Sequence, residues 1–327
     1  MSIDRFLALL ADGRFHSGTT LAGELGMSRA AVWKRASDLR ELGLDVHAVR
    51  GKGYRLHSHV VLLNADRIRE RLSKPTLDAL DSLVAETVVD STNARLMMSD
   101  VPPAGKARVC LAEYQTAGRG RRGRHWQAPF GSGLCLSIGY SFADLPADIG
   151  VLSLATGVVV VEALARENLS GVGLKWPNDI IWQRRKLGGV LVELRGEAGG
   201  PAYAVIGVGI NTALPQSVRD ALEAGDYRVA DLSDIAGATP DRNVIAAAVI
   251  DRIIQMLKNV ETVGFADSIT HFRRYDVLKD EPVTVRFGDE RFEGVAAGVD
   301  RTGAFILNSA TGKRTFSGGE VTVRTGK

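Results

Sequence analysis

Near the N-terminus, apolar residues recur at helical spacing. In residues 18–44, GTTLAGELGMSRAAVWKRASDLRELGL, Leu21 and Leu25 are four positions apart and share a helix face. Gly26 interrupts this pattern, and Ser28 is a favourable N-cap for a second helix. The spacing therefore predicts two short helices joined by a glycine-containing turn.

The second predicted helix has an apolar face and a basic face. The apolar positions, at i, i+4 and i+7, are Val32, Ala36 and Leu39. The opposite face carries Arg29, Trp33 and Lys34. This arrangement is typical of a helix-turn-helix.

The pattern then changes to alternation. Residues 45–56, DVHAVRGKGYRL, alternate on both sides of Gly51-Lys52-Gly53, which predicts a two-stranded ribbon with a basic tip. Such a wing could bring Arg50, Lys52 and Arg55 to DNA phosphates. A small helical packing domain without DNA contact is the alternative. The basic tip and outer face favour DNA, and the predicted DNA-binding residues are Ser28, Arg29, Trp33, Lys34, Arg50 and Lys52.

Apolar runs in the central region predict buried strands. They include residues 108–116, the segment after the KWPND turn, GGVLVEL, and AYAVIGVGIN ending at Asn211. Before them, a linker leads to a helix that we expect Asn64 to cap. From Glu281 onward, apolar and polar residues alternate between GD and DRTG turns, which predicts a small antiparallel barrel.

Composition limits the classes of protein. The 327 residues allow two or three domains, and 24% charged with 45% hydrophobic residues is a globular balance. With 41 basic and 38 acidic residues, any nucleic-acid site must be local. Cys110 and Cys135 lie in apolar runs and are expected in the core, not in a disulfide or a metal site. The N-terminus does not have the pattern of a signal peptide, and residues 151–165 are too short to span a bilayer. We expect a soluble cytoplasmic protein without a membrane partner.

The densest positive charge lies in residues 117–126, AGRGRRGRHW. Gly118, Gly120 and Gly123 match G-x-G-x-x-G, but the following HWQAPFGSG cannot open a helix, which excludes a Rossmann site. A nucleic-acid patch, a loop that grips an anionic small molecule, and a solvated basic loop remain. The sequence contains no Walker motif.

Further polar groups lie where predicted strands end. DSTN, at a predicted strand-to-helix junction, could cap the helix or bind a polar ligand. KWPND combines Asn178 and Asp179 with an apolar setting, and a turn held by local backbone hydrogen bonds is the alternative to a ligand site. Lys186 is expected just before a strand, and Gly188-Gly189 allow another backbone or a ligand to approach.

Taken in order, DSTN, EYQTAGRGRRGRHW, KWPND, RRKLGG and GVGIN resemble the biotin–protein ligases over essentially the whole chain. SRAAVWK and GKGYRL match the winged helix of the bifunctional bacterial members, which are also repressors of the biotin operon. The resemblance implies an α+β protein with a winged helix-turn-helix domain (1–62), a mixed-sheet biotin/lipoate-ligase-like catalytic domain (63–275) and an SH3-like C-terminal β-barrel (276–327).

The resemblance also implies a function. The chain would form biotinyl-5'-AMP from biotin and Mg-ATP and transfer biotin to a lysine of the biotin carboxyl carrier protein of acetyl-CoA carboxylase. It would dimerise when biotinyl-AMP is bound, bind operator DNA and repress biotin synthesis genes. A ligase with a vestigial winged helix, a non-catalytic biotin-sensing repressor and, more distantly, a lipoate ligase are the alternatives.

By the same resemblance, residues receive roles. Those expected in catalysis are Arg119, Arg121, Lys186 and Asp179. Those expected to bind biotin are Ser91, Thr92, Asn93, Gln115, Gly118, Arg119, Gly120, Arg121 and Lys186. Those expected to bind ATP are Arg121, Arg122, Trp126, Asn178, Asn211 and Arg324. No metal-ligating side chains are expected, since Mg²⁺ enters with ATP. Two features depart from the family pattern: Trp33 stands where a polar base-reading residue is expected, and residues 213–242 are acidic and divergent.

Overall fold

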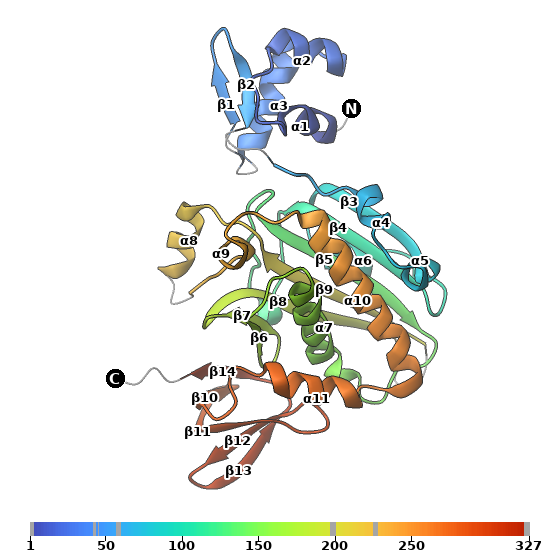
Figure 1. The fold of residues 1–327 in the computed structure, drawn as a ribbon, viewed down its shortest axis with the longest axis vertical. Coiled ribbons are helices and arrows are strands. Elements are labelled where there is room, and N and C mark those ends of the chain that lie inside the picture. The colour runs from blue at the N-terminus through green and yellow to red at the C-terminus, as the bar shows by residue number, and fades with distance from the viewer. Residues whose placement is uncertain are drawn as a thin grey trace.

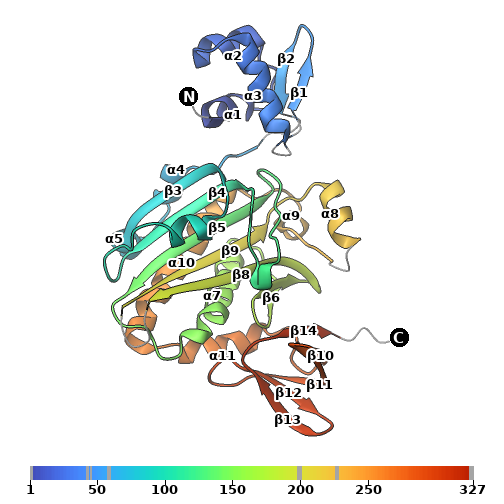
Figure 2. The same ribbon diagram turned by 180° about the vertical axis from the view of Figure 1, so that it is seen from behind.

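The computed structural model describes residues 3–41, 44, 46–56, 60–196, 201–224 and 228–323. Three parts follow one another along the long axis (Figures 1 and 2). A small helical part with a two-stranded ribbon lies at one end, a large sheet covered by helices lies in the middle, and a small antiparallel sheet lies at the other end. This confirms the predicted α+β fold class.

The N-terminal part is a winged helix-turn-helix. Its helices are α1 (Ile3–Leu10), α2 (Gly18–Leu25) and α3 (Arg29–Glu41), and its ribbon consists of β1 (Val46–Val49) and β2 (Gly53–Leu56). Gly26 ends α2 in the left-handed conformation, at φ +61°. The Ser28 hydroxyl accepts the Ala31 N–H at 3.2 Å, as expected for the N-cap of α3. The predicted inward residues Val32, Ala36 and Leu39 are buried.

The ribbon is joined to the segment between α1 and α2 by a single antiparallel bridge. His16 and Tyr54 exchange backbone hydrogen bonds of 2.8 and 2.9 Å. A Cβ on Gly53 would lie 2.0 Å from the His16 carbonyl oxygen, and Gly53 has φ +100°, so only glycine fits there.

The central sheet has seven strands in the order β3-β4-β5-β9-β8-β7-β6. They are β3 (Leu80–Val89), β4 (Ala107–Gln115), β5 (Gly133–Phe142), β6 (Val172–Lys175), β7 (Asp179–Trp182), β8 (Arg185–Gly196) and β9 (Ala202–Asn211). β3 and β4 are parallel and the other neighbours are antiparallel, so the sheet is mixed, as predicted. All ten residues of β5 are buried, which explains its continuous apolar run.

Helices cover both faces of this sheet. α7 (Leu152–Arg166) and α10 (Arg242–Val263) lie on the face turned to the viewer in Figure 1, and α6 (Thr92–Met97) lies on the opposite face (Figure 2). Residues 149–166 are the one described segment long and apolar enough to cross a bilayer, but most of it is buried in the core. Cys110 and Cys135, on β4 and β5, are buried free thiols, as expected.

Shorter helices complete the central part. They are α4 (Ala65–Arg69), α5 (Lys74–Ala79), α8 (Gln216–Glu223), α9 (Leu232–Ala236) and α11 (Ala266–Tyr275), with 3₁₀ turns at Arg121–Gly123 and Ile149–Val151. The Asn64 side chain accepts the Arg67 N–H at 2.9 Å, which confirms it as the cap of α4.

The C-terminal part is a five-stranded antiparallel sheet in the order β13-β12-β11-β10-β14. The strands are β10 (Pro282–Phe287), β11 (Glu290–Val299), β12 (Phe305–Ser309), β13 (Gly312–Phe316) and β14 (Glu320–Val323). This sheet packs on the central part, where the Trp176 indole N–H donates to the Gly303 carbonyl at 3.0 Å.

The linker into the central part is held by a buried ion pair. Arg242, at the start of α10, lies 2.7 Å from the Glu113 carboxylate, and both side chains are about 95% buried. Arg242 also donates to the Val61 carbonyl at 2.8 Å, and Glu113 accepts the Leu63 N–H at 2.5 Å. Phe130, from the central part, packs into the N-terminal core cluster. The two parts are therefore joined by contacts as well as by the chain.

Candidate functional site

The strand-to-helix junction after β3 is a buried polar network. Ser91 caps α6, and Gln115 at the end of β4 accepts both the Thr92 N–H (2.8 Å) and the Thr92 hydroxyl (3.1 Å). Ser137, in the middle of β5, donates to the Thr92 hydroxyl at 2.7 Å or to the side-chain amide oxygen Oδ1 of Asn93 at 2.6 Å. The structure thus brings together the side chains expected to bind the biotin ureido group.

Within this network, the Asn93 amide is fully engaged. Its Oδ1 faces Ser137, and its Nδ2 donates to Glu193 Oε2 at 2.8 Å. A Cβ on Gly207 would lie 2.4 Å from Asn93 Oδ1, so the glycine makes room for this side chain. A ligand that contacts Asn93 would have to share these partners.

Residues 117–126 form a tight loop over this junction. Gly120 N–H donates to the Arg124 carbonyl at 2.7 Å, and Trp126 N–H donates to the Gly118 carbonyl at 3.0 Å. A Cβ on Gly118 would lie 2.4 Å from the Trp126 carbonyl oxygen. Arg122 has φ +56°. The loop is therefore an ordered turn, and its fold depends on Gly118.

The arginines of this loop differ in their partners. Arg119 lies 3.5 Å from Glu193, and Arg122 and Arg124 pair with Glu320 of β14. Arg121 has no carboxylate within ion-pair distance among the described residues. Burial, and then the neighbouring Arg122 charge, lower the pKa of the Arg121 guanidinium from its ordinary value. Arg121 is thus a half-buried cation available to an anionic ligand.

A second group of charges lies on β6, β7 and β8. Lys186 Nζ is 2.6 Å from Asp179 Oδ1, across the β7–β8 pairing. Burial lowers the pKa of the nearby Lys175 amine, while the Asp179 carboxylate acts in the opposite direction. Lys186 lies inside β8, beside an irregularity in the β7–β8 register, and not just before the strand as expected. A Cβ on Gly188 would lie 2.4 Å from the Gly209 carbonyl oxygen, so Gly188 permits a close backbone approach.

Three residues expected to contact ATP have partners within the protein. The Asn178 amide donates to the Val190 carbonyl at 2.8 Å, and Asn211 donates to the Ala230 carbonyl at 3.0 Å. The Trp126 ring lies across Gly209, where a Cβ would come within 2.6 Å of it. Burial raises the pKa of the Cys135 thiol to about 11, and the Trp126 indole N–H acts to lower it, so this donor points at the core thiol of β5. Arg324 lies outside the described residues.

A cavity of about 380 Å³ lies beside the loop, within the usual size range of small-molecule sites. Its walls include Asp90, Ser91, Ala94, Arg119, Arg124 and His125. Ser91 and Arg119, both predicted site residues, meet here. The described residues contain no group of three or more His, Cys, Asp or Glu side chains arranged to hold a metal ion.

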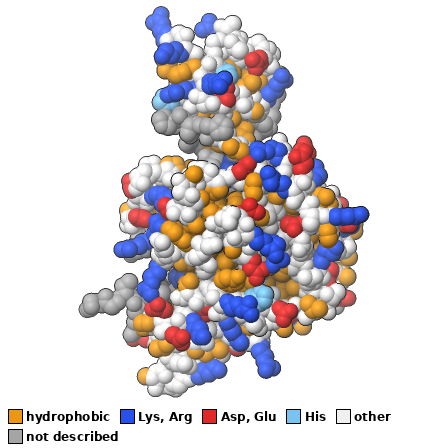
Figure 3. All heavy atoms as spheres, in the orientation of Figure 1, with side chains coloured by type: hydrophobic (Ala, Val, Ile, Leu, Met, Phe, Trp, Pro, Cys, Tyr) orange, Lys and Arg blue, Asp and Glu red, His pale blue; other side chains and the backbone are white. Residues whose placement is uncertain are grey.

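The predicted DNA-binding residues lie on the surface of the N-terminal part. Ser28, Arg29, Trp33, Lys34, Arg50 and Lys52 are exposed, with Trp33 at 60%. The Ser28 hydroxyl is used by the helix cap, while Lys52 and Arg55 lie over the Phe15 ring at 5.9 and 4.8 Å. Lys and Arg side chains project from the outer end of this part (Figure 3).

Sequence reasoning missed Ser137, Glu193 and Glu320. A serine in the middle of the predominantly apolar strand β5 was a usable signal for Ser137, because a buried hydroxyl requires a partner. Glu193 and Glu320 lie on strands far along the chain from the loop, and nothing in their neighbouring residues indicates their contacts.

Comparisons with known proteins agree with this arrangement. Family models match residues 4–55 (HTH domain), 85–211 (Biotin/lipoate A/B protein ligase family) and 280–324 (Biotin protein ligase C terminal domain). The chain is 39% identical to the Bifunctional ligase/repressor BirA of Salmonella typhimurium, covering 98% of this chain and 96% of that protein. It is 38% identical to the protein of that name from Escherichia coli, covering 98% and 97%. It is also similar to the structure of the biotin protein ligase from Aquifex aeolicus in complex with biotin and ATP, with a TM-score of 0.61, 28% identity, and coverage of 75% of this chain and 100% of that chain.

Proposed function

The chain belongs to the family of bifunctional ligase/repressors, and we propose that it activates biotin with ATP, transfers it to a protein lysine and represses transcription. The observation that carries the ligase function is the meeting of the arginine-glycine loop with the Ser91–Gln115 network. There, a network of hydroxyl and amide groups suited to a neutral head group adjoins a cluster of cations suited to carboxylate and phosphate.

The first step joins two anions. A biotin carboxylate oxygen attacks the α-phosphorus of Mg-ATP, the bond to the β-phosphate oxygen breaks, and pyrophosphate leaves. We assign charge neutralisation to Arg119, Arg121 and Lys186, because preorganised cations are most effective where charge develops in a partly closed site. Arg121 has no carboxylate partner to give up among the described residues, whereas Arg119 and Lys186 must share or leave theirs.

The second step forms an amide. The acceptor lysine amine attacks the carbonyl carbon of biotinyl-5'-AMP, AMP leaves, and the nitrogen loses a proton. We assign to Asp179 the orientation of the incoming amine, since its carboxylate already holds an ammonium group, that of Lys186, at 2.6 Å. No nucleophilic side chain of the protein is needed for either step.

In this proposal the ureido group of biotin and the nucleotide are bound by different residues. Ser91, Thr92 and Gln115 bind the ureido group, with the Gly118 and Gly120 backbone beside them, and Asn93 orders the network through Ser137. We assign to the Trp126 ring a stacking contact with the adenine base. The remaining nucleotide contacts are assigned to Arg122, Asn178, Asn211 and Arg324.

The repressor function rests on the winged helix. Arg29, Trp33 and Lys34 lie on the exposed face of α3, and Arg50 and Lys52 lie at or beside the wing tip. We propose that two chains dimerise when biotinyl-AMP is bound and place their winged helices on a two-fold operator of biotin synthesis genes. The acceptor in this proposal is the biotin carboxyl carrier protein, and the compartment is the cytoplasm.

One experiment tests both functions. DNA from upstream of the organism's biotin synthesis genes is examined by mobility shift at fixed salt, with and without biotin and Mg-ATP, alongside biotinylation of an apo carrier protein. A shift that needs both ligands, with biotinylation, is expected. Biotinylation without any shift would leave a ligase with a vestigial winged helix, and a shift without biotinylation would leave a sensor.

A further inference from the structure

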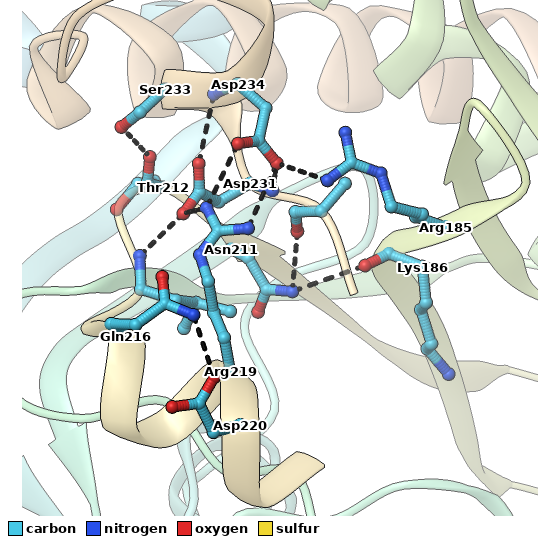
Figure 4. Close-up of polar contacts among 12 residues, drawn as sticks. Arg185, Lys186, Asn211, Thr212, Gln216, Arg219, Asp220, Asp231, Ser233 and Asp234 are labelled. Carbon is cyan, nitrogen blue, oxygen red and sulfur yellow. Dashed lines mark hydrogen bonds and ion pairs between the residues drawn. The ribbon is translucent and has the colours of Figure 1, made fainter. Parts of the chain in front are cut away.

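A cluster of four charged side chains ties the chain after β9 to the strand that carries Lys186. Arg185 comes from β8, Arg219 from α8, and Asp231 and Asp234 from the first turn of α9 (Figure 4). We call these four residues the carboxylate–arginine cluster. Three of the four, Arg219, Asp231 and Asp234, lie in residues 213–242, the segment that departs from the family pattern.

Asp231 is the most buried member, at 1% exposure. Its Oδ2 accepts the Leu214 N–H at 2.7 Å and a hydrogen bond from Arg219, and its Oδ1 accepts the Asp234 N–H at 3.1 Å. A carboxylate buried this deeply is stable only when donors replace its water. Asp231 therefore fixes three pieces of chain at one point: the exit of β9, helix α8 and the start of α9.

Asp234 extends the cluster to β8. Its carboxylate accepts hydrogen bonds from Arg185 and Arg219, both at 3.1 Å. Burial acts to raise the pKa of Asp234, but the hydrogen bond from Arg219 and the surrounding donors outweigh it and hold the pKa below its ordinary value. Arg219 thus bridges two carboxyl groups, a role that suits the planar guanidinium group.

The backbone next to the cluster holds Lys186 in place. Lys186 N–H donates to the Arg228 carbonyl at 2.8 Å, and its carbonyl accepts the Ala230 N–H at 2.9 Å. Asn211 donates to the Ala230 carbonyl at 3.0 Å. Residue 230 directly precedes Asp231, so the position of Lys186 along β8 depends on a stretch of chain that the cluster anchors.

We propose that Asp231 and Arg219 are positioning residues for adenylate formation, holding the backbone at 228–231 and through it Lys186 and Asn211. This inference rests on the proposed ligase function. The residues assigned to the biotin ureido group, Ser91, Thr92 and Gln115, belong to other elements and do not touch the cluster. Loss of the cluster therefore slows adenylation without weakening the binding of biotin alone.

The test compares Arg219→Gln with Asp220→Asn in the full-length protein. Asp220 is a matched control because it lies next to Arg219 on α8, is exposed, and its side chain bonds only Gln216 among the described residues. Biotin-dependent exchange of pyrophosphate into ATP gives kcat/KM for ATP, and calorimetric titration of biotin without ATP gives its Kd. We expect Arg219→Gln to lower kcat/KM for ATP by about tenfold or more, while the biotin Kd matches that of Asp220→Asn. The Tm of Arg219→Gln should fall, because Asp231 stays buried without its charged partner, so both assays are run well below the Tm of this variant.

Two further variants keep the test decisive. Arg219→Lys retains the positive charge but not the planar guanidinium that can bond two carboxylates at once. We therefore expect an exchange rate between those of wild type and Arg219→Gln. Asp234→Asn removes only the charge of the more exposed carboxylate. It is expected to lower kcat/KM for ATP less than Arg219→Gln does. Equal exchange rates in Arg219→Gln and Asp220→Asn would overturn the inference, as would a parallel loss of biotin binding. A wild-type protein without exchange activity would overturn the proposed function itself.

Discussion

At the scale of single residues, the pairing of Lys186 with Asp179 separates the two chemical steps. We predict that Asp179→Asn keeps pyrophosphate exchange within about threefold of wild type, because Arg119, Arg121 and Lys186 remain cationic. Transfer from preformed biotinyl-AMP to an apo carrier protein should slow by about 10²-fold or more, the usual size of a contribution from a group that handles the reacting proton. Abolished exchange in this variant would contradict the orienting role.

Asp276 gives a prediction about pH. Burial raises the pKa of this carboxyl from 3.8 to about 6, although the Leu278 N–H acts to lower it, and Asp276 Oδ2 has no hydrogen-bond partner. The folded protein therefore binds a proton more tightly than the unfolded chain. The resulting stability is present below about pH 4 and is lost as the pH rises through about 6.

Asp276→Asn removes this dependence. We expect the Tm of wild type, measured relative to Asp276→Asn, to fall between pH 4.5 and pH 7, by an amount corresponding to about 1–3 kcal/mol. The comparison at each pH cancels the titration of the other carboxylates. A constant difference in Tm over this range would show that Asp276 does not titrate there.

At the scale of elements, the loop of residues 117–126 works only if its backbone closes tightly. We predict that Gly118→Ala lowers kcat/KM for biotin by about tenfold or more, because its Cβ would lie 2.4 Å from the Trp126 carbonyl oxygen and the loop must shift. Gly150→Ala is the control, since its Cβ would meet nothing within 4 Å. Equal activity of the two variants would mean that the loop adapts to a side chain at position 118.

The elements that sequence predicted best are those with local signals. The caps at Ser28 and Asn64, the glycine turn between α2 and α3, and the strand-to-helix junction at Ser91 all depend on residues close together in the chain. Glu193, Glu320 and the ion pairs of the carboxylate–arginine cluster could not be predicted in this way, because they join different strands and helices. Within the cluster, only the Asp231–Asp234 capping box is local. The position of Lys186 inside β8 was missed because the β7–β8 register shift depends on pairing and not on composition.

At the scale of the whole molecule, we predict that ligand binding controls assembly. Sedimentation at micromolar concentration should show a monomer without ligands and a dimer with saturating biotin and Mg-ATP. Biotin with a non-hydrolysable ATP analogue that cannot form the adenylate is the control, and a monomer is expected there. A monomer under all three conditions would contradict adenylate-dependent dimerisation.

The packing of Phe130 has a consequence for protein engineering. Phe130 is 8% exposed because it lies in the core cluster of the N-terminal part, and Tyr114, Val60 and Leu62 pack against the same cluster. Removing the residues before 60, to obtain a smaller enzyme that only biotinylates, would expose Phe130 and Tyr114 to solvent. A soluble truncated version of this chain would therefore need polar replacements at Phe130 and its neighbours, and shortening alone would yield an aggregation-prone protein.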